Sequence, residues 1–415
     1  MGLAISNHRA GDPTHLHNGF CALRAQFSLK DYGQLSIGQV MRAVLVGYCR
    51  TPFQRAHRGA LKDTRPEDMA AAVIKGVIER TSTSGDLIED LLLGCAYPEG
   101  EQGLNLGRIA TYMAGLPHTV PGMTTNRLCG SSMQVIHTAA GNIALGSGDA
   151  FICAGVESMS RVMRGGFNRT PHPHLESSYP EAYISMGMTA ENLANSHQIS
   201  RIDQEQFAAM SHSKAIIAQN EGLLKDEIVS VSNIDVDGCM REPNLEKMAQ
   251  LSPAFIETGS VTAATSSPLT DGASAIMVCS ESFAMENNLI PLASIVSTAV
   301  AGVAPEIMGY GPVPATMKAM NRADISMDDL EIIEINEAFS SQSMACVKDL
   351  GLNMDDSRIN VDGGAIAIGH PLGASGCRIT GKAASLLQRT GGQFALATMC
   401  IGGGMGIATV LERWN

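Results

Sequence analysis

The chain has 415 residues, of which 45% are hydrophobic and 17% are charged, a composition typical of globular proteins and not of disordered chains or coiled coils. At about 150 residues per folding unit, this length predicts two or three packed units. The formal charge of −12 argues against nucleic acid as the main partner, because a phosphate backbone requires a basic face. No uninterrupted apolar run reaches the about 18 residues of a membrane span, so we expect none.

The first part of the chain differs from the rest. Residues 1–40 contain no sustained hydrophobic period and no apolar core of a secretory signal, and we expect a disordered N-terminal extension there. Apolar runs then alternate with helical patterns. We expect strands over residues 42–49 and 87–95 and helices over residues 67–80 and 107–115. This alternation predicts an α/β fold with a central sheet.

Two distant segments follow the same plan. Residues 128–155 run from a Gly/Ser turn through an amphipathic helix and a glycine stop into a strand, and residues 371–399 repeat that order. Two such units favour a duplicated fold whose halves face each other. Residues 159–269 are more polar and richer in loops, which predicts an inserted loop domain acting as a lid. The domains expected are an N-terminal half over 41–158, completed by 270–290, and a C-terminal half over 291–415.

The ten cysteines contain no C-x-x-C pair and do not belong to a short secreted chain, so we expect reduced thiols in a cytoplasmic protein. Cys129 precedes Gly130 at the start of an expected helix. Unpaired N–H groups and the helix dipole favour a thiolate there. A buried structural cysteine is an equally good interpretation from position alone.

Three further residues lie at turns where side chains can act on a ligand. His370 lies in a Gly/Pro-rich turn, which would present its ring as a general base or oxyanion donor. Cys400 ends a strand and precedes Gly402 and its neighbouring glycines, whose backbone could approach a ligand closely; an incidental thiol beside a hairpin is the alternative. Asn336 follows an expected strand and could hold a water or an oxyanion, although such residues are more often turn or cap residues.

Two motifs are dismissed. Residues 376–382 have the spacing of a phosphate-binding loop, but Ala383 stands where a hydroxyl is needed and the match lies inside an expected helix. His172 and His174 lack further ligands at metal-binding spacing. We therefore expect no metal and no bound cofactor.

Four segments, residues 126–133, 336–339, 369–376 and 400–406, together resemble the four signature segments of the thiolase family. They occur in the family's order and spacing, and the resemblance spans residues 41–413. It is greatest to the degradative 3-ketoacyl-CoA thiolases of fatty-acid β-oxidation, with support from residues 308–314 and 397–402. The resemblance implies a duplicated five-layered αβαβα thiolase fold and an acyltransferase that cleaves 3-ketoacyl-CoA with CoA, CoA being a substrate and not a cofactor.

The resemblance also implies roles for individual residues. Cys129 matches the nucleophile that becomes acylated, and His370 matches the base that activates it. Cys400 matches the cysteine that exchanges a proton with the acetyl-CoA carbanion. Asn336 matches the residue that holds a water, and this water forms, with His370, one oxyanion hole around the thioester enolate. The backbone N–H groups of Cys129 and Gly402 match the hole for the acyl-enzyme oxyanion.

The resemblance extends to the loop region. Met186 and Ser267 match CoA-contacting segments of the family, with Phe255 and Phe339 as pocket walls. Ser185 stands where short-chain thiolases carry His, which favours a broader acyl specificity. The family implies a homodimer or homotetramer, and a hydratase/dehydrogenase subunit of a β-oxidation complex is a possible partner.

Three alternatives share parts of this pattern. An acetyl-CoA acetyltransferase running in the Claisen direction would use the same catalytic residues. A decarboxylating ketoacyl synthase would need a second catalytic His where this chain has Cys400. A non-catalytic scaffold subunit would have no reason to retain all the polar catalytic residues.

Overall fold

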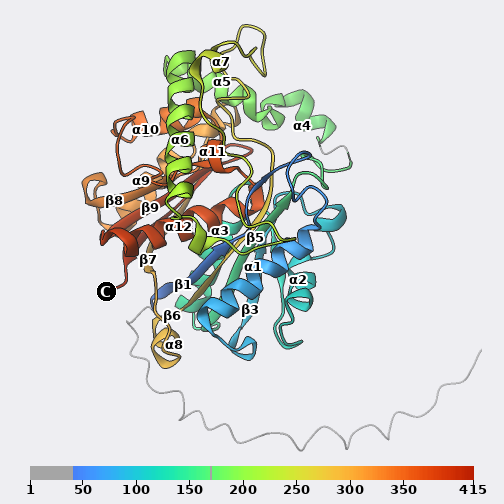
Figure 1. Ribbon diagram of the computed structural model, residues 1–415, viewed down its shortest axis with the longest axis vertical. Helices are drawn as coiled ribbons and strands as arrows, with labels where there is room; N and C mark the ends of the chain where they lie inside the picture. The colour runs from blue at the N-terminus through green and yellow to red at the C-terminus, as the bar shows by residue number, and fades with distance from the viewer. Residues whose placement is uncertain (1–40, 169–170) are drawn as a thin grey trace, which may run out of the picture. The chain divides into compact units, whose positions relative to one another are not determined.

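A computed structural model of the protein describes residues 41–168 and 171–415 (Figure 1). The extension expected over residues 1–40 lies outside the described residues. Within the described chain, the strands are β1 (Ala43–Arg50), β2 (Gln54–Arg55), β3 (Asp90–Gly94), β4 (Met123–Thr125), β5 (Ala150–Ser158), β6 (Thr270–Ser280), β7 (Ala293–Gly302), β8 (Leu330–Ile335), β9 (Phe394–Ile401) and β10 (Met405–Arg413). None of the helices in this part of the chain has the length and apolar character needed to cross a membrane.

The strands form one sheet in the order β4-β3-β5-β6-β1-β7-β10-β9-β8, with β2 paired to β6. The two halves of the sheet meet at β1 and β7, which share a register of only two residue pairs. Each half repeats the same pairing: β3 runs parallel to β5 and β8 parallel to β9, while β6 and β10 run antiparallel to the strands on either side. The internal duplication expected from the sequence is therefore present in the topology.

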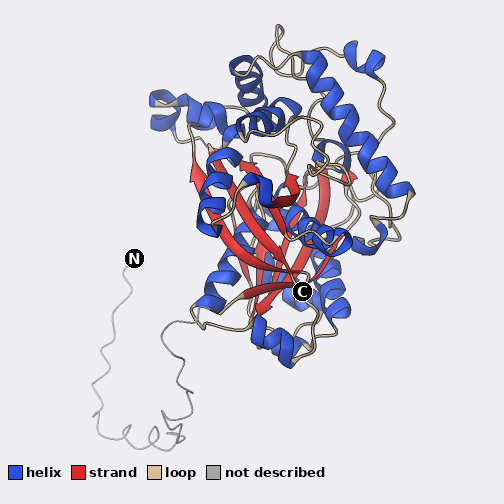
Figure 2. Ribbon diagram, turned by 90° about the vertical axis from the view of Figure 1, so that its left-hand side faces the viewer, coloured by secondary structure: helices blue, strands red, loops and turns tan. Residues whose placement is uncertain are grey.

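The principal helices follow the same repeat. They are α1 (Pro66–Thr81), α2 (Leu106–Ala114) and α3 (Ser131–Ala144) in the N-terminal half, and α9 (Pro312–Ala323), α10 (Ser340–Asp349) and α12 (Ser375–Thr390) in the C-terminal half. One core packs α1 and α2 on the first half of the sheet, and another packs α9 and α10 on the second. A third core joins α3 and α12 to both halves, so these two helices form the middle layer (Figure 1). Figure 2 shows the strands at the centre of the described chain, with helices packed around them. The arrangement is the five-layered αβαβα fold.

The middle layer is closely packed where α3 and α12 begin. A Cβ atom on Gly376 would lie 2.3 Å from the backbone nitrogen of Met133, so only glycine allows this approach. The Cys377 N–H donates to Ser132 Oγ at 2.9 Å. Because both helices start here, the positive ends of their dipoles lie in one region.

Four further helices lie in the expected loop domain: α4 (Pro173–Ser178), α5 (Met186–Ser196), α6 (Arg201–Asn220) and α7 (Leu245–Ala249). They gather at one end of the strands (Figure 1). Buried ion pairs connect the same region to the two halves. Arg50 on β1 pairs with Asp237 at 2.7 Å and Glu227 at 2.7 Å, and Lys382 on α12 pairs with Glu227 at 2.5 Å. Removing one partner would leave an uncompensated buried charge, so these contacts strongly disfavour separation of residues 227–237 from β1 and α12.

Most of the expected helices and strands are confirmed with small shifts at their ends, but the predicted start of one strand is wrong. The strand expected over residues 87–95 covers only Asp90–Gly94, and a 3-10 turn over Gly85–Leu87 precedes it. The Ile88 N–H donates to the Gly85 carbonyl, which closes this turn and delays the strand. The apolar side chain of Leu87 is exposed there and does not extend the sheet. The spacing match over residues 376–382 lies inside α12, as expected.

Candidate active site

Cys129 lies in a tight turn that leads into α3. Leu128 before it has a φ of 45°, a left-handed conformation that is uncommon for a branched side chain. The turn is held by Ser131, whose Oγ donates to the Leu128 carbonyl at 2.6 Å and accepts from the Arg127 N–H at 2.9 Å. The conformation thus holds the half-buried thiol of Cys129 next to the helix N-terminus.

The turn between β9 and β10, which contains Gly402, lies next to the loop that carries this thiol. Burial raises the pKa of Cys129 to about 11, and a hydrogen bond from the Gly402 backbone N–H opposes that rise. A Cβ atom on Gly402 would lie 3.0 Å from Leu128 Cδ1 and 3.6 Å from Met186 Sδ, which shows how closely this turn approaches the nucleophile loop. The Gly402 amide therefore lies on the side of Cys129 from which a hydrogen bond can reach its sulfur.

Cys400 is buried on β9 beside the same thiol. Burial raises its pKa, and the charge of a Cys129 thiolate raises it further, so the two sulfurs interact electrostatically. Both cysteines are free thiols. A neutral Cys400 thiol in this position can act as a proton donor.

His370 is held through three contacts. Its backbone N–H donates to Thr270 Oγ1 at 3.0 Å, and its ring Nδ1 lies 2.6 Å from Ser375 Oγ. Because Ser375 Oγ donates to the Pro371 carbonyl, it accepts from Nδ1–H, which leaves Nε2 with a free lone pair. Asn336 Nδ2 lies 3.4 Å from that Nε2. Burial, together with the charge of Arg378, lowers the pKa of His370 to about 4, so the imidazole is neutral at neutral pH and can act as a base.

Asn336 contacts strand β9 through its backbone and His370 through its side chain. It follows β8, and its backbone N–H donates to the Thr398 carbonyl on β9 at 3.0 Å, two residues before Cys400. The structure therefore brings together Cys129 with Gly402, Cys400 beside Cys129, and Asn336 beside His370. All five come from the ends of strands or the starts of middle-layer helices.

Two of the four residues expected to contact CoA, Met186 and Phe339, pack in one cluster with Cys400. Met186 packs against a cluster that contains Cys400 and Phe339. The rings of Phe255 and Phe339 meet edge to face with centroids 5.9 Å apart. The Ser267 N–H donates to the carbonyl of Ala338, the neighbour of Phe339, at 3.0 Å. Through these contacts the four residues connect to the cluster that contains Cys400, and together we call them the wall.

Sequence reasoning missed several residues of this region. Ser375 could have been found, because it follows His370 by five residues in the same Gly/Pro-rich turn. Thr270 lies 100 residues from His370 and gives no local signal. Arg55 pairs with Thr270 across β2 and β6, and burial and the charge of Arg55 lower the pKa of Arg241. In the described part of the chain, no three His, Cys, Asp or Glu side chains are arranged to hold a metal ion.

Known proteins share this chain's sequence and fold. The family described as Thiolase, N-terminal domain matches residues 43–282, and Thiolase, C-terminal domain matches residues 289–413. A 3-ketoacyl-CoA thiolase of Photobacterium profundum is 46% identical over 384 residues, covering 89% of this chain and 99% of the relative. One from an Enterobacter species is 45% identical over 386 residues, covering 90% and 99%. Human mitochondrial 3-ketoacyl-CoA thiolase, solved in complex with CoA, superposes with a TM-score of 0.83 at 35% identity and covers 91% of this chain and 99% of its own. The chain belongs to the thiolase family.

Proposed function

We propose that this chain is a 3-ketoacyl-CoA thiolase, an acyltransferase that cleaves 3-ketoacyl-CoA with CoA to acetyl-CoA and a shortened acyl-CoA in fatty-acid β-oxidation. The observation that carries the proposal is the placement of two thiols, Cys129 and Cys400, beside each other, one of them facing the Gly402 N–H. Carbon–carbon cleavage needs both a nucleophile and a separate proton donor, and this pair supplies them. The relatives named 3-ketoacyl-CoA thiolase favour this direction over Claisen synthesis.

The first half of the proposed reaction acylates Cys129. Neutral His370 takes the thiol proton at Nε2, and the sulfur attacks C3 of the substrate. The developing oxyanion at C3 accepts hydrogen bonds from the N–H groups of Cys129 and Gly402. The C2–C3 bond then breaks, its electron pair forms a thioester enolate, and Asn336 with protonated His370 stabilises the enolate oxygen.

The second half releases both products. Cys400 gives its proton to C2, and acetyl-CoA leaves. The Cys400 thiolate then takes the proton of the incoming CoA thiol, and the CoA sulfur attacks the acyl-Cys129 carbonyl. The Cys129 thiolate that departs recovers the proton held by His370. Every step uses protein groups and CoA, which enters as a substrate, so the proposal requires no cofactor and no metal.

CoA recognition is proposed from the wall described above. Met186, Phe255, Phe339 and Ser267 would flank the pantetheine arm and the thioester. Arg55 and Arg241 would face CoA phosphates, because the charge of Arg55 acts on Arg241 and a bound anion would offset that repulsion. An Arg241→Ala variant should raise KM for CoA and leave kcat nearly unchanged.

The domain division, assembly and compartment are also proposals. We propose an N-terminal half over 41–158 and 270–290, a loop domain over 159–269 and a C-terminal half over 291–415. A homodimer or homotetramer is supported by β4, an edge strand whose backbone could pair with another chain. The nine cysteines of the described residues are all unpaired, which supports a reducing cytoplasm. A hydratase/dehydrogenase subunit would be a partner in a β-oxidation complex.

Mass spectrometry tests the function directly. Incubation with a 3-ketoacyl-CoA in the absence of CoA should add the acyl mass to Cys129, and addition of CoA should remove it. A series of 3-ketoacyl-CoA chain lengths should show thiolysis beyond the four-carbon substrate. Label on another cysteine would contradict the assignment, and activity restricted to acetoacetyl-CoA would favour the acetyltransferase.

A further inference from the structure

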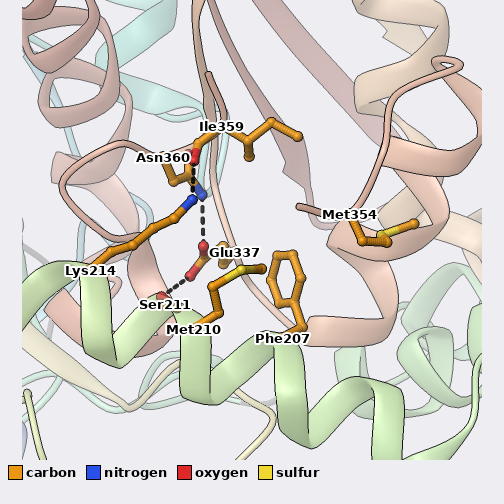
Figure 3. Close-up of a pocket in the computed structure, with 8 residues that line it drawn as sticks. All are labelled: Phe207, Met210, Ser211, Lys214, Glu337, Met354, Ile359 and Asn360. Carbon is orange, nitrogen blue, oxygen red and sulfur yellow. Dashed lines mark hydrogen bonds between the residues drawn. The ribbon is translucent and has the colours of Figure 1, made fainter. Parts of the chain in front are cut away.

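Glu337 follows Asn336 and carries a buried carboxylate that contacts groups from three segments. Its Oε1 accepts a hydrogen bond from Asn360 Nδ2 at 2.7 Å. Its Oε2 accepts from Ser211 Oγ at 2.6 Å and from the Ile366 N–H at 3.2 Å. Figure 3 shows the carboxylate between Ser211 on α6 and Asn360. A carboxylate with this many donors is fixed in position.

The space beside this carboxylate is too small for a substrate. It is a cavity of about 10 Å³, lined by Phe207, Met210, Ser211, Lys214, Glu337, Met354, Ile359 and Asn360 (Figure 3). That volume holds about one water molecule. Lys214 Nζ donates to the Ile359 carbonyl at 2.8 Å, and burial lowers its pKa. Glu337 therefore acts on neighbouring protein groups and not on a ligand of its own.

The contacts of Glu337 clamp the peptides on both sides of Asn336. Asn360 Oδ1 accepts from the Ile335 N–H and Asn360 Nδ2 donates to the Ile335 carbonyl, both at 2.9 Å. The same Nδ2 reaches Glu337. Asn360 thus connects Ile335, which precedes Asn336, to Glu337, which follows Asn336. The Asn336 side chain projects from a backbone held at both ends.

The same carboxylate reaches the segment that leads to His370. Ile366 lies in α11 (Ala365–Ile368), and Gly369 separates that helix from His370. Ser211 Oγ accepts from the Gly364 N–H at 3.2 Å while it donates to Glu337, so the loop-domain helix α6 joins this arrangement. His370 has additional anchors in Ser375 and Thr270 and depends less on the carboxylate.

We propose that Glu337 is a positioning residue that holds Asn336 opposite His370 Nε2 for stabilisation of the thioester enolate, an inference that rests on the proposed function. Three donors converge on its two oxygens. A glutamine at this position has one oxygen and an NH₂ group, which would face either the Asn360 amide or the Ser211 and Ile366 donors. The substitution therefore keeps the size of the side chain and disrupts the clamp.

The test compares two reactions of the full-length enzyme. Thiolysis of a 3-ketoacyl-CoA forms the enolate. Exchange of the acyl group between an acyl-CoA and labelled CoA uses Cys129, His370 and Gly402, together with proton transfer between Cys400 and the CoA thiol, but forms no enolate. Glu337→Gln should lower kcat for thiolysis about 10- to 100-fold, the effect of a small displacement of a reacting group. It should change the exchange rate by less than about threefold.

A double variant separates positioning from general damage. If Glu337 acts through Asn336, then Asn336→Ala with Glu337→Gln should be no slower than Asn336→Ala alone, within about threefold. Additive losses, equal losses of thiolysis and exchange, or an unchanged thiolysis rate in Glu337→Gln would each overturn the inference. Wild-type exchange without thiolysis would instead contradict the proposed function.

Two further variants complete the design. Glu205→Gln serves as a control: it removes a different buried carboxylate, which lies on α6 and pairs with Arg201 at 2.5 Å. This variant should leave the ratio of thiolysis to exchange unchanged. Should Glu337→Gln fail to fold, Ser211→Ala removes a single donor to the carboxylate. It should lower that ratio about 3- to 10-fold, and an unchanged ratio would refute the positioning role.

Discussion

Asn336 Nδ2 and His370 Nε2 lie 3.4 Å apart, although 34 residues separate them in the chain. The ring is neutral and its Nδ1–H donates a hydrogen bond to Ser375 Oγ, so Nε2 is a hydrogen-bond acceptor in the free enzyme. Once that nitrogen takes the thiol proton of Cys129, it becomes a donor. The same pair of groups therefore changes from a base and its neighbour into two donors facing one oxygen.

The first prediction concerns this pair. Asn336→Ala should lower kcat for thiolysis about 10²- to 10³-fold, the usual loss for one oxyanion-hole donor. KM should change little, because Asn336 acts on charge that develops in the transition state. Steady-state kinetics will measure both constants, and acyl exchange with labelled CoA serves as the control. A loss of exchange as large as the loss of thiolysis would contradict the role.

The second prediction concerns alkylation of Cys129. Burial raises the pKa of this thiol to about 11, so it is protonated at neutral pH and depends on His370 for activation. His370→Ala should slow iodoacetamide labelling of Cys129 at about pH 7.5 by about 10²-fold or more, within the range for loss of a general base. The rate in the variant should rise steadily as the pH approaches the pKa of the thiol. Peptide mass spectrometry measures both, and equal rates in wild type and variant would show that Cys129 is activated without His370.

The sequence and the structure agree where signals are local. The turn that places Cys129, the Gly/Pro segment around His370 and the glycines after Cys400 each carry their signal within a few residues. These signals predict where each middle-layer helix starts. They therefore also predict which residues are candidates for the catalytic chemistry. Contacts such as Arg50 with Asp237, 187 residues apart, have no such signal, because nothing in a polar loop indicates which buried charge it will meet.

Glu337 shows the limit most clearly. An acidic residue after a strand is usually solvated, and only the fold brings Ser211, Asn360 and Ile366 around it. Burial consequently raises the pKa of Glu337, against the effect of these hydrogen bonds. Sequence patterns predicted the adjacent Asn336 as a candidate but not the residue that holds it.

The third prediction concerns the dependence of stability on pH. Burial lowers the pKa of His137 to about 3, with the charges of Arg127 and Arg322 adding to the effect. The unfolded chain takes up a proton near about pH 6.5 while the folded protein does not. Stability is therefore complete above about pH 6.5 and falls as the pH decreases toward about 3. His137→Gln lacks this titration, so the free energy of unfolding of the wild type should fall relative to the variant between about pH 7 and about pH 4.5. Urea denaturation at both pH values measures the difference, and a constant difference would contradict the prediction.

The fourth prediction contrasts two glycines of the middle layer. Gly376→Ala places a methyl group 2.3 Å from the Met133 nitrogen and should destabilise the fold by about 2 kcal/mol or more, because backbone cannot move aside easily. Gly141 in α3 has no atom within 4 Å of its Cβ position. Gly141→Ala should stabilise the protein by about 0.5 to 1 kcal/mol through helix propensity. Thermal or urea unfolding of both variants checks the pair, and a stable Gly376→Ala protein would show that α3 and α12 can separate.

The fifth prediction separates the two thiols. Cys400 is buried beside Cys129 and is proposed to protonate C2 after the carbon–carbon bond breaks. A serine hydroxyl is a much weaker acid than a thiol, so Cys400→Ser should lower thiolysis about 10²- to 10⁴-fold, the range for a general acid. Acyl-Cys129 should still form from an acyl-CoA, because that step protonates no carbon and CoA can leave as a thiolate without the proton of Cys400. Two measurements distinguish the outcomes: mass spectrometry of the acyl-enzyme and exchange of deuterium from solvent into C2 of acetyl-CoA. The variant should keep the first and lose the second. Loss of the acyl-enzyme in Cys400→Ser would place Cys400 in nucleophile activation instead, whereas undiminished deuterium exchange would mean that another group carries the proton.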